Sequence, residues 1–291
     1  MLTANAPAKI NLALHVTGQR TDGYHLIESL VVFTELGDQV SADLADADSF
    51  DLVGPEAGAL SRLSSDNNLV TRARDALRQA AHAAGHAAPA VQIRLNKRLP
   101  VASGIGGGSA DAAAALRLLG QLWNFQPTAD VLSEIALGLG ADVPMCLVSR
   151  PLIASGIGEK IDPLKIRFSL DVVIVNPRIG VSTPTVFSAL QSRQNPPLPL
   201  PGHLDDRGAL AAFLAANRND LELPARQMVP QISACLAALD DTGASFVRMS
   251  GSGASCFGLY DNAQAAGAAA TAISASRPDW FVAATRTLPA E

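Results

Sequence analysis

The sequence predicts an α/β protein built from two lobes. The chain has 291 residues, which is enough for two cores of ordinary size. Stretches that alternate in polarity, as strands do, are interleaved with stretches whose apolar residues recur at helical spacing. Arg150-Pro151 interrupts the chain near its middle, so we expect one lobe over residues 1–150 and a second over residues 151–291.

The composition indicates a folded protein of a reducing compartment. Hydrophobic residues make up 48% of the chain, and the formal net charge of -5 argues against a general nucleic-acid surface. Cys146, Cys235 and Cys256 lie far apart without the spacing of a zinc site, so we expect buried thiols. No apolar run approaches the ~18 residues of a membrane span, and the N-terminus lacks the pattern of a secretory signal. We therefore expect a cytoplasmic protein with no nucleic-acid or membrane partner.

The first strand is predicted over residues 8–16. Its alternation places four apolar side chains on one face: Ile10, Leu12, Leu14 and Val16. The opposite face carries a more polar set: Lys9, Asn11, Ala13 and His15. That second face either meets water, as the polar side of an antiparallel strand usually does, or carries a functional site, and the residues alone leave both open.

The remaining elements follow from local patterns and cap residues. In the first lobe we expect strands over residues 30–34, 39–44 and 91–95, a helix capped within Asp66-Asn67-Asn68 and ending near Gly85, a helix through about Leu122, and a helix from Thr128 to Leu137. In the second lobe we expect strands over residues 172–175 and 280–285, helices over residues 208–216, 225–239 and 262–276, and a proline-rich surface connection over residues 194–202. Two further strands flank residues 250–255, a loop of small residues that indicates either a close backbone neighbour or a tight hairpin.

Residues 100–113, PVASGIGGGSADAA, form the most informative stretch of the chain. Glycine lets the backbone approach a ligand, and a helix that begins near Ser109 would direct its N–H groups and positive dipole end at an anion. The stretch therefore predicts a phosphate-binding loop, with a flexible turn as the alternative. It is not a Walker A motif, because Gly108-Ser109-Ala110 supplies no lysine. It is not a dinucleotide fingerprint either, because Ser109 stands where the third glycine belongs.

Two charged residues complete a candidate constellation for phosphoryl transfer. Such a reaction needs a held nucleotide, a cation near the developing charge and a base for the attacking hydroxyl. Lys9 offers the cation, and Asp142 offers the base in a turn between Gly140 and Pro144. Asp is also an ordinary turn residue, so Asp142 alone leaves a structural role open.

The order of these motifs resembles the kinase superfamily named for galactose, homoserine, mevalonate and phosphomevalonate kinases, the GHMP kinases. The resemblance covers most of the chain and rests on PAKINL at residues 7–12, GQRTDGYH at 18–25, GIGGGSADAA at 104–113, GADVP at 140–144, VSTP at 181–184, NDLE at 219–222 and SGSGA at 250–254. Ser103 and Ile105 depart from the usual glycine and leucine, and neither change affects contacts made by backbone N–H groups.

The resemblance implies a two-lobed α+β fold with mixed sheets, whose first, ATP-binding lobe is like domain 2 of ribosomal protein S5. It also implies that ATP phosphorylates the 2-hydroxyl of a cytidine-diphosphate-linked methylerythritol, a step toward isoprenoid precursors. By the family's pattern Asp142 is the base and Lys9 is its partner. The chemistry of phosphoryl transfer implies Mg²⁺. Ser109 at the end of the glycine-rich motif could reach the ion, and its other protein ligands stay open.

The resemblance also implies which residues bind the two ligands. Those matched to the nucleotide site are Asn68, Lys97, Pro100, Val101, Ala102, Ser103, Gly104, Ile105, Gly106, Gly107, Gly108, Ser109 and Ala110. Those matched to the substrate site are Asn11, Tyr24, His25, Thr183 and Phe187, with Tyr24 and Phe187 stacking on the pyrimidine.

Two other functions stay open at this point. One is another small-molecule kinase of the superfamily, acting on homoserine or mevalonate, although these substrates have no base for Tyr24 and His25 to hold. The other is a non-catalytic sensor on the same fold, which the presence of both Lys9 and Asp142 disfavours. We expect a monomer or a homodimer.

Overall fold

The computed structural model describes residues 1–60, 68–199 and 204–290. The chain folds into two compact units, of which unit 1 comprises Met1–Ala8, Gly37–Val101 and Gly106–Val148, and unit 2 comprises Lys9–Leu36, Ala102–Ile105 and Ser149–Glu291. Strands β1 (Leu2–Gln19) and β2 (His25–Leu44) each contribute to both units. The lobe boundary at residue 150 stays a prediction. Two expectations fall partly outside the described residues. They are the helix cap, at Asp66 and Asn67, and the proline-rich connection, at residues 200–202.

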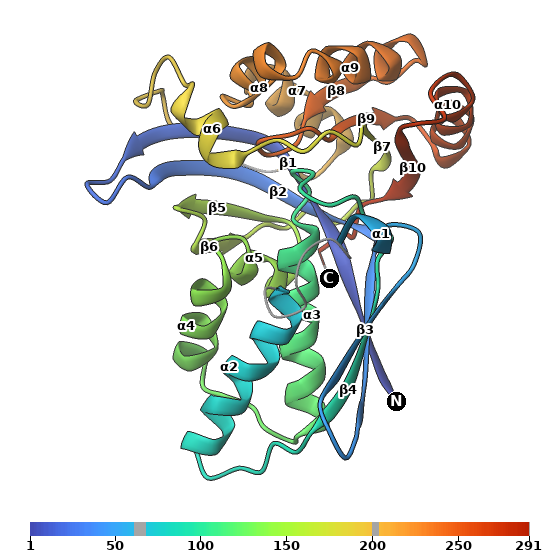
Figure 1. Ribbon diagram of the computed structural model, residues 1–291. Coiled ribbons are helices and arrows are strands. Elements are labelled where there is room, and N and C mark those ends of the chain that lie inside the picture. The colour runs from blue at the N-terminus through green and yellow to red at the C-terminus, as the bar shows by residue number, and fades with distance from the viewer. Residues whose placement is uncertain (61–67, 200–203, 291) are drawn as a thin grey trace. The chain divides into compact units, whose positions relative to one another are not determined.

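Unit 1 contains a small sheet and a group of helices. Strand β4 (Val91–Asn96) pairs antiparallel with residues 39–44 of β2 and parallel with β3 (Ser49–Val53). The helices of this unit are α1 (Ala57–Leu60), α2 (Leu69–Ala83), α3 (Gly107–Leu122), α4 (Ala129–Leu139) and α5 (Val143–Val148). Helices α2 and α3 pack side by side (Figure 1).

The helices of unit 1 begin where local chemistry predicts. The Asn68 side chain accepts the N–H of Val70 at 2.9 Å, and the Thr128 hydroxyl accepts the N–H of Val131 at 3.4 Å, so both predicted caps are confirmed. Helix α3 begins at Gly107 rather than near Ser109, because Gly106 adopts a left-handed φ of 67° and its carbonyl already accepts the first helical hydrogen bond.

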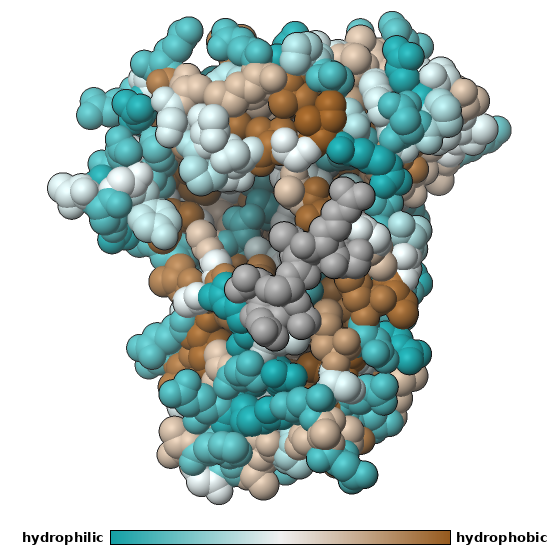
Figure 2. All heavy atoms as spheres, in the orientation of Figure 1, coloured by the Kyte–Doolittle hydropathy of each residue, from teal (hydrophilic) through white to brown (hydrophobic). Residues whose placement is uncertain are grey.

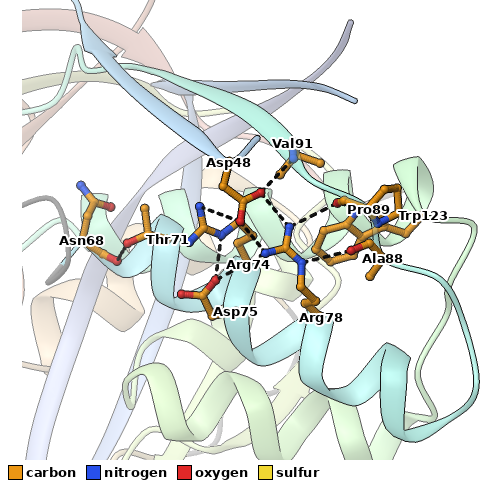
Figure 3. Close-up of polar contacts among 10 residues, drawn as sticks. All are labelled: Asp48, Asn68, Thr71, Arg74, Asp75, Arg78, Ala88, Pro89, Val91 and Trp123. Atoms are coloured by element: carbon orange, nitrogen blue, oxygen red, sulfur yellow. Dashed lines mark hydrogen bonds and ion pairs between the residues drawn. The ribbon is translucent and has the colours of Figure 1, made fainter. Parts of the chain in front are cut away.

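A polar network fixes α2 to the first residue of β4 (Figure 3). Asp48 accepts a hydrogen bond from Arg78 Nη2 at 2.8 Å and another from the N–H of Val91 at 2.9 Å, and Arg74 lies beside it. The hydrogen bond from Arg78 is the main cause that lowers the pKa of Asp48 to about 2. Arg78 also lies over the ring of Trp123, 5.2 Å from its centroid.

Unit 2 is centred on an antiparallel sheet whose two central strands are buried on both faces. Its strand order is β10 (Phe281–Arg286), β7 (Asp171–Asn176), β9 (Cys256–Tyr260) and β8 (Phe246–Met249). Along β7, Val173 and Val175 pack toward helices α9 (Gln231–Asp241) and α10 (Ala263–Ser276), while Val172 and Ile174 pack toward β1 and β2. Burial on both sides explains why this strand reads as an uninterrupted apolar run.

The other elements of unit 2 surround this sheet. Strand β5 pairs antiparallel with residues 27–31 of β2 and with β6. These elements are β5 (Leu152–Gly156), β6 (Lys160–Pro163), α6 (Thr183–Ser188), α7 (Arg207–Ala216) and α8 (Glu222–Met228).

Three predicted elements are joined or divided differently in the structure. The separate strands over residues 30–34 and 39–44 are one strand, β2, in which Gly37 makes no turn. A Cβ at Gly37 would collide with the carbonyl of Ala6, so this glycine permits the close passage of β1. The single helix over residues 225–239 is two helices, α8 and α9, because Pro230 supplies no N–H to continue the first.

The visible face of each unit mixes hydrophilic and hydrophobic residues (Figure 2). No helix within the described ranges is long and apolar enough to cross a membrane.

Candidate active site

Part of the glycine-rich loop, defined here as residues 100–106, packs against a second glycine loop formed by residues 250–255 between β8 and β9. Within unit 2, the N–H of Ser255 donates to the carbonyl of Ser103 at 3.0 Å, and the hydroxyl of Ser250 donates to the carbonyl of Gly104 at 3.1 Å. Gly104 has a φ of 75°, and a Cβ there would lie 2.6 Å from the carbonyl oxygen of Ser250. A Cβ at Gly251 would lie 2.8 Å from the carbonyl oxygen of Gly104. The two loops therefore touch through backbone atoms at positions where a side chain does not fit.

The polar face of β1 is buried beside these loops. Lys9, Asn11 and His15 are at most 4% exposed, so this face does not meet water. The N–H of Lys9 donates to the carbonyl of Ile105 at 2.9 Å, and the N–H of Asn11 donates to the hydroxyl of Ser250 at 3.1 Å. Strand β1 thus holds Lys9 directly against the glycine-rich loop.

The side chain of Asn11 is fixed at one end and unsatisfied at the other. Its Nδ2 donates to Ser29 Oγ at 2.7 Å, and this hydroxyl donates to the carbonyl of Ala13 at 2.6 Å. Its Oδ1 is buried and has no hydrogen-bond partner among the described residues. This oxygen lies on the side of Gly251, 3.3 Å from the position of a Cβ there. A buried acceptor without a donor is costly, so a ligand hydroxyl would find a favourable partner here.

Helix α6 brings two more predicted substrate residues to the same part of unit 2. The Thr183 hydroxyl hydrogen-bonds the Ser252 hydroxyl at 2.8 Å. One turn later, the Phe187 ring stacks on His25 with centroids 4.7 Å apart and an interplanar angle of 28°. Contacts therefore run without interruption from His25 through α6 to the second glycine loop.

His25 presents a buried nitrogen to this region. Its Nε2 has no hydrogen-bond partner within the described part of the chain. Burial, with a smaller effect of the nearby charge of Arg193, lowers the pKa of His25 and favours the neutral ring. Tyr24 is 58% exposed, so its ring is open to a ligand.

In unit 1 the first turn of α3 offers an anion-binding site. The N–H groups of Gly107, Gly108 and Ser109 have no carbonyl of a preceding helical turn to bind. Leu69, the first residue of α2, lies 3.5 Å from the position of a Gly108 Cβ, so the N-termini of α2 and α3 are neighbours. The N-terminal end of α2, capped by Asn68, therefore lies near the start of α3.

Asp142 occupies the turn between α4 and α5, as predicted. Its carbonyl accepts the N–H of Cys146 at 3.2 Å, which starts α5, and the N–H of Val143 donates to Gly140 at 3.0 Å. The residue is partly exposed. Asp142 belongs to unit 1 and Lys9 to unit 2, and their joint role in catalysis stays a prediction.

Lys97 is engaged in an ion cluster inside unit 1. Its side chain is 2% exposed, and its ammonium lies within hydrogen-bond distance of both Asp38 and Asp111. Its predicted contact with adenosine stays a prediction, and the structure gives its charge two carboxylate partners.

Asn219 and Arg248 support the site, although the sequence motifs predicted no role for either side chain. Asn219 Nδ2 donates to the carbonyls of Met249 and Gly251, each at 2.9 Å, and so holds the second glycine loop. Arg248 donates to the carbonyl of Leu12 at 2.7 Å, which fixes β1, and burial lowers its pKa to about 10. The signals were present, because Asn219 opens the NDLE motif and Arg248 is a single charge in an apolar strand.

Comparisons with known proteins agree with this geometry. The family described as GHMP kinases N terminal domain matches residues 68–150, and GHMP kinases C terminal matches residues 188–279. The chain is 55% identical over 288 residues to the 4-diphosphocytidyl-2-C-methyl-D-erythritol kinase of Sinorhizobium medicae, covering 98% of this chain and 95% of that protein. It is 52% identical over 284 residues to the kinase of the same name from Agrobacterium fabrum, covering 97% of this chain and 95% of that protein.

Solved structures share the fold. A crystal structure of 4-(cytidine 5'-diphospho)-2C-methyl-D-erythritol kinase matches with a TM-score of 0.81 and 31% identity, covering 99% of this chain and all (100%) of the other. A mevalonate kinase of L. major matches with a TM-score of 0.70 and 16% identity, covering 100% of this chain and 97% of the other, which shows the fold alone.

The α/β fold with its glycine-rich loop at a helix start is that of a GHMP kinase, an ATP-dependent enzyme. Within these kinases the chain belongs to the family of the 4-diphosphocytidyl-2-C-methyl-D-erythritol kinases, as the full-length identity shows.

Proposed function

We propose that the chain transfers the γ-phosphoryl group of ATP to the 2-hydroxyl of 4-diphosphocytidyl-2-C-methyl-D-erythritol, in the methylerythritol phosphate route to isoprenoid precursors. The observation that carries this proposal is 55% identity, over 98% of the chain, to a relative named as the kinase of that substrate. The contacts of the predicted substrate residues Thr183, Phe187 and His25 within unit 2 support it.

Asp142 is the proposed general base, and Lys9 its partner. A tertiary alcohol is a poor acid, so the reaction needs a positioned carboxylate to accept the hydroxyl proton. Lys9 stabilises the ionised aspartate and the charge that develops on the oxygen or the transferring phosphoryl group. The backbone contact between Lys9 and Ile105 supports this role, because it fixes the lysine at the glycine-rich loop.

The cytidine is proposed to bind at Tyr24, His25 and Phe187. Tyr24 and Phe187 offer ring faces for the pyrimidine, and the unpaired Nε2 of His25 offers a hydrogen bond to its edge. Asn11 and Thr183 bind the erythritol or the diphosphate, and the unsatisfied Oδ1 of Asn11 matches a donating hydroxyl.

The triphosphate is proposed to lie against the glycine-rich loop and the first turn of α3, with Asn68 and Lys97 toward the adenosine. Magnesium is proposed to enter with the phosphates of ATP, because phosphoryl transfer from ATP needs metal charge near their oxygens. Ser109 in the first turn of α3 is the candidate protein ligand. When bound, Mg²⁺ neutralises charge on the β- and γ-phosphate oxygens.

The remaining proposals concern the protein's setting. We place it in the cytoplasm as a monomer or homodimer, with an ATP-binding lobe over residues 1–150 and a GHMP kinase C-terminal lobe over residues 151–291. The matches at residues 68–150 and 188–279 support this division.

A coupled assay of ADP release tests the function. With ATP and Mg²⁺, we expect ADP release with 4-diphosphocytidyl-2-C-methyl-D-erythritol and none with homoserine or mevalonate in parallel reactions. Activity only with homoserine or only with mevalonate would show that the proposed substrate is wrong. If none of the acceptors gives ADP release above the background rate, the result would support the non-catalytic sensor instead.

Phe187→Ala tests the pyrimidine site. Loss of a stacking ring costs about 1–3 kcal/mol, so we expect the KM for the cytidine-linked substrate to rise on the order of 10- to 100-fold while the KM for ATP holds. Phe213→Ala on α7 is the control, because it removes a ring from another core of the same unit. An unchanged KM for the cytidine-linked substrate would remove Phe187 from the site.

A further inference from the structure

Lys97 belongs to a buried ion cluster at the base of the glycine-rich loop. The cluster joins Asp38 of β2, Lys97 after β4 and Asp111 of α3, and all three lie in unit 1. Their side chains are 0%, 2% and 3% exposed, respectively. The Lys97 ammonium donates to Asp111 Oδ2 at 2.8 Å and, by a shorter bond, to Asp38 Oδ2.

The cluster contacts the chain on both sides of the loop. On the entering side, Asp38 Oδ1 accepts the N–H of Leu99, the residue directly before the loop, at 2.8 Å. On the leaving side, Asp111 lies about one turn into α3, and Lys97 Nζ lies 3.1 Å from the position of a Cβ on Gly107. One group of three side chains therefore holds both ends of residues 100–106.

Such a cluster is poorly suited to a purely stabilising role. Two carboxylates face one ammonium, and burial is the main cause that raises the pKa of Asp111 to about 8. The desolvation cost of buried charges offsets much of their attraction, so the cluster is no more stabilising than well-packed apolar side chains, although removal of one partner alone is costly. Their strict geometric demands instead favour a single arrangement of the elements that they join.

We propose that Asp38, Lys97 and Asp111 are positioning residues that fix the two ends of the glycine-rich loop and preorganise the start of α3 for the phosphates of ATP. A loop that is already ordered loses less conformational entropy when ATP binds, so the protein binds ATP more tightly. By this route Lys97 acts on the phosphates through the loop, in addition to its proposed place near the adenosine. The inference rests on the proposed function in taking ATP as the ligand of this helix start.

The test compares two variants at one position. Asp111→Ala removes the acceptor for Lys97 and is expected to weaken binding of a nonhydrolysable ATP analogue on the order of 10-fold. It is expected to leave the affinity for the cytidine-linked substrate unchanged. Asp111→Asn keeps an oxygen acceptor and is expected to restore the wild-type affinity for the analogue. Titration calorimetry with each ligand separately gives both affinities without turnover.

Asp48→Ala is the matched control, because it removes another carboxylate of unit 1 that is held by arginines (Figure 3). It is expected to keep the affinity for the ATP analogue. Wild-type affinity in Asp111→Ala overturns the proposal, and so does an equal loss for both ligands or an equal loss in Asp48→Ala.

A second variant covers a failure of Asp111→Ala to fold. Lys97→Met/Asp111→Ala removes the ammonium together with one carboxylate and leaves Asp38 its backbone N–H partners. The same selective loss of affinity for the analogue is expected. A wild-type chain that binds the analogue and fails to phosphorylate the substrate would contradict the proposed function alone, because the binding test needs no catalysis.

Discussion

Asp142→Asn is expected to lower turnover by ~10²- to 10⁴-fold, the usual contribution of a positioned general base. The asparagine keeps the shape of the side chain, and the turn depends on the backbone carbonyl of Asp142, so the fold should persist. Affinity for the ATP analogue should also persist, because the substitution removes the proton acceptor and leaves the glycine-rich loop intact. Steady-state kinetics with calorimetry for nucleotide binding separate the two effects.

Asp130→Asn is the control for this experiment, because Asp130 is an exposed carboxylate in the first turn of the neighbouring α4. It should keep full turnover. If Lys9 and Asp142 act as one unit, Lys9→Met/Asp142→Asn will lose little more than Asp142→Asn. Wild-type turnover in Asp142→Asn, or loss of its fold, would return Asp142 to an ordinary turn residue.

Gly104→Ala is expected to destabilise the chain by about 2–4 kcal/mol and to remove ATP binding. The new Cβ would lie 2.6 Å from the carbonyl oxygen of Ser250 and 2.7 Å from that of Gly253, and the φ of 75° is unfavourable for alanine. The loop or its neighbour must move, and the N–H groups that are proposed to bind the phosphates move with it. Urea unfolding and titration with the ATP analogue measure the two consequences.

Gly138→Ala is expected to change the stability of the chain in the opposite direction. Gly138 lies within α4, and a Cβ there meets no neighbouring atom within 4 Å. Alanine in an exposed helix is favoured over glycine by about 0.5–1 kcal/mol, so this variant should be slightly more stable and bind ATP normally. A Gly104→Ala chain as stable as Gly138→Ala would show that the contact with the second glycine loop is not tight.

The elements that the sequence predicted correctly are those set by neighbouring residues. Asn68, Thr128 and Asn262 cap helices through side chains that reach N–H groups only two or three residues away. The role of Gly37 was not readable, because it depends on Ala6, which a different strand brings against it. Pro230 shows a local signal that was available and was overridden by the helical pattern around it.

The same distinction applies to the candidate site. The motifs indicated Lys9, the glycine-rich loop and Asp142, because each motif is continuous in sequence. The partners of the other residues come from distant segments: Ser29 for Asn11, Ser252 for Thr183 and Asp38 for Lys97. Spacing along the chain carries no information about such pairs, since they form only when the sheets and loops are assembled.

The division of the chain into its two units limits how the protein can be dissected. The backbone passes from one unit to the other after residues 8, 36, 101, 105 and 148. A single cut therefore releases neither unit whole, and a fragment that ends at residue 150 would carry β1 and β2 without the β7 sheet against which they pack. Moving the termini by circular permutation, with every segment retained, suits this chain better than truncation for engineering it or for following its assembly during synthesis.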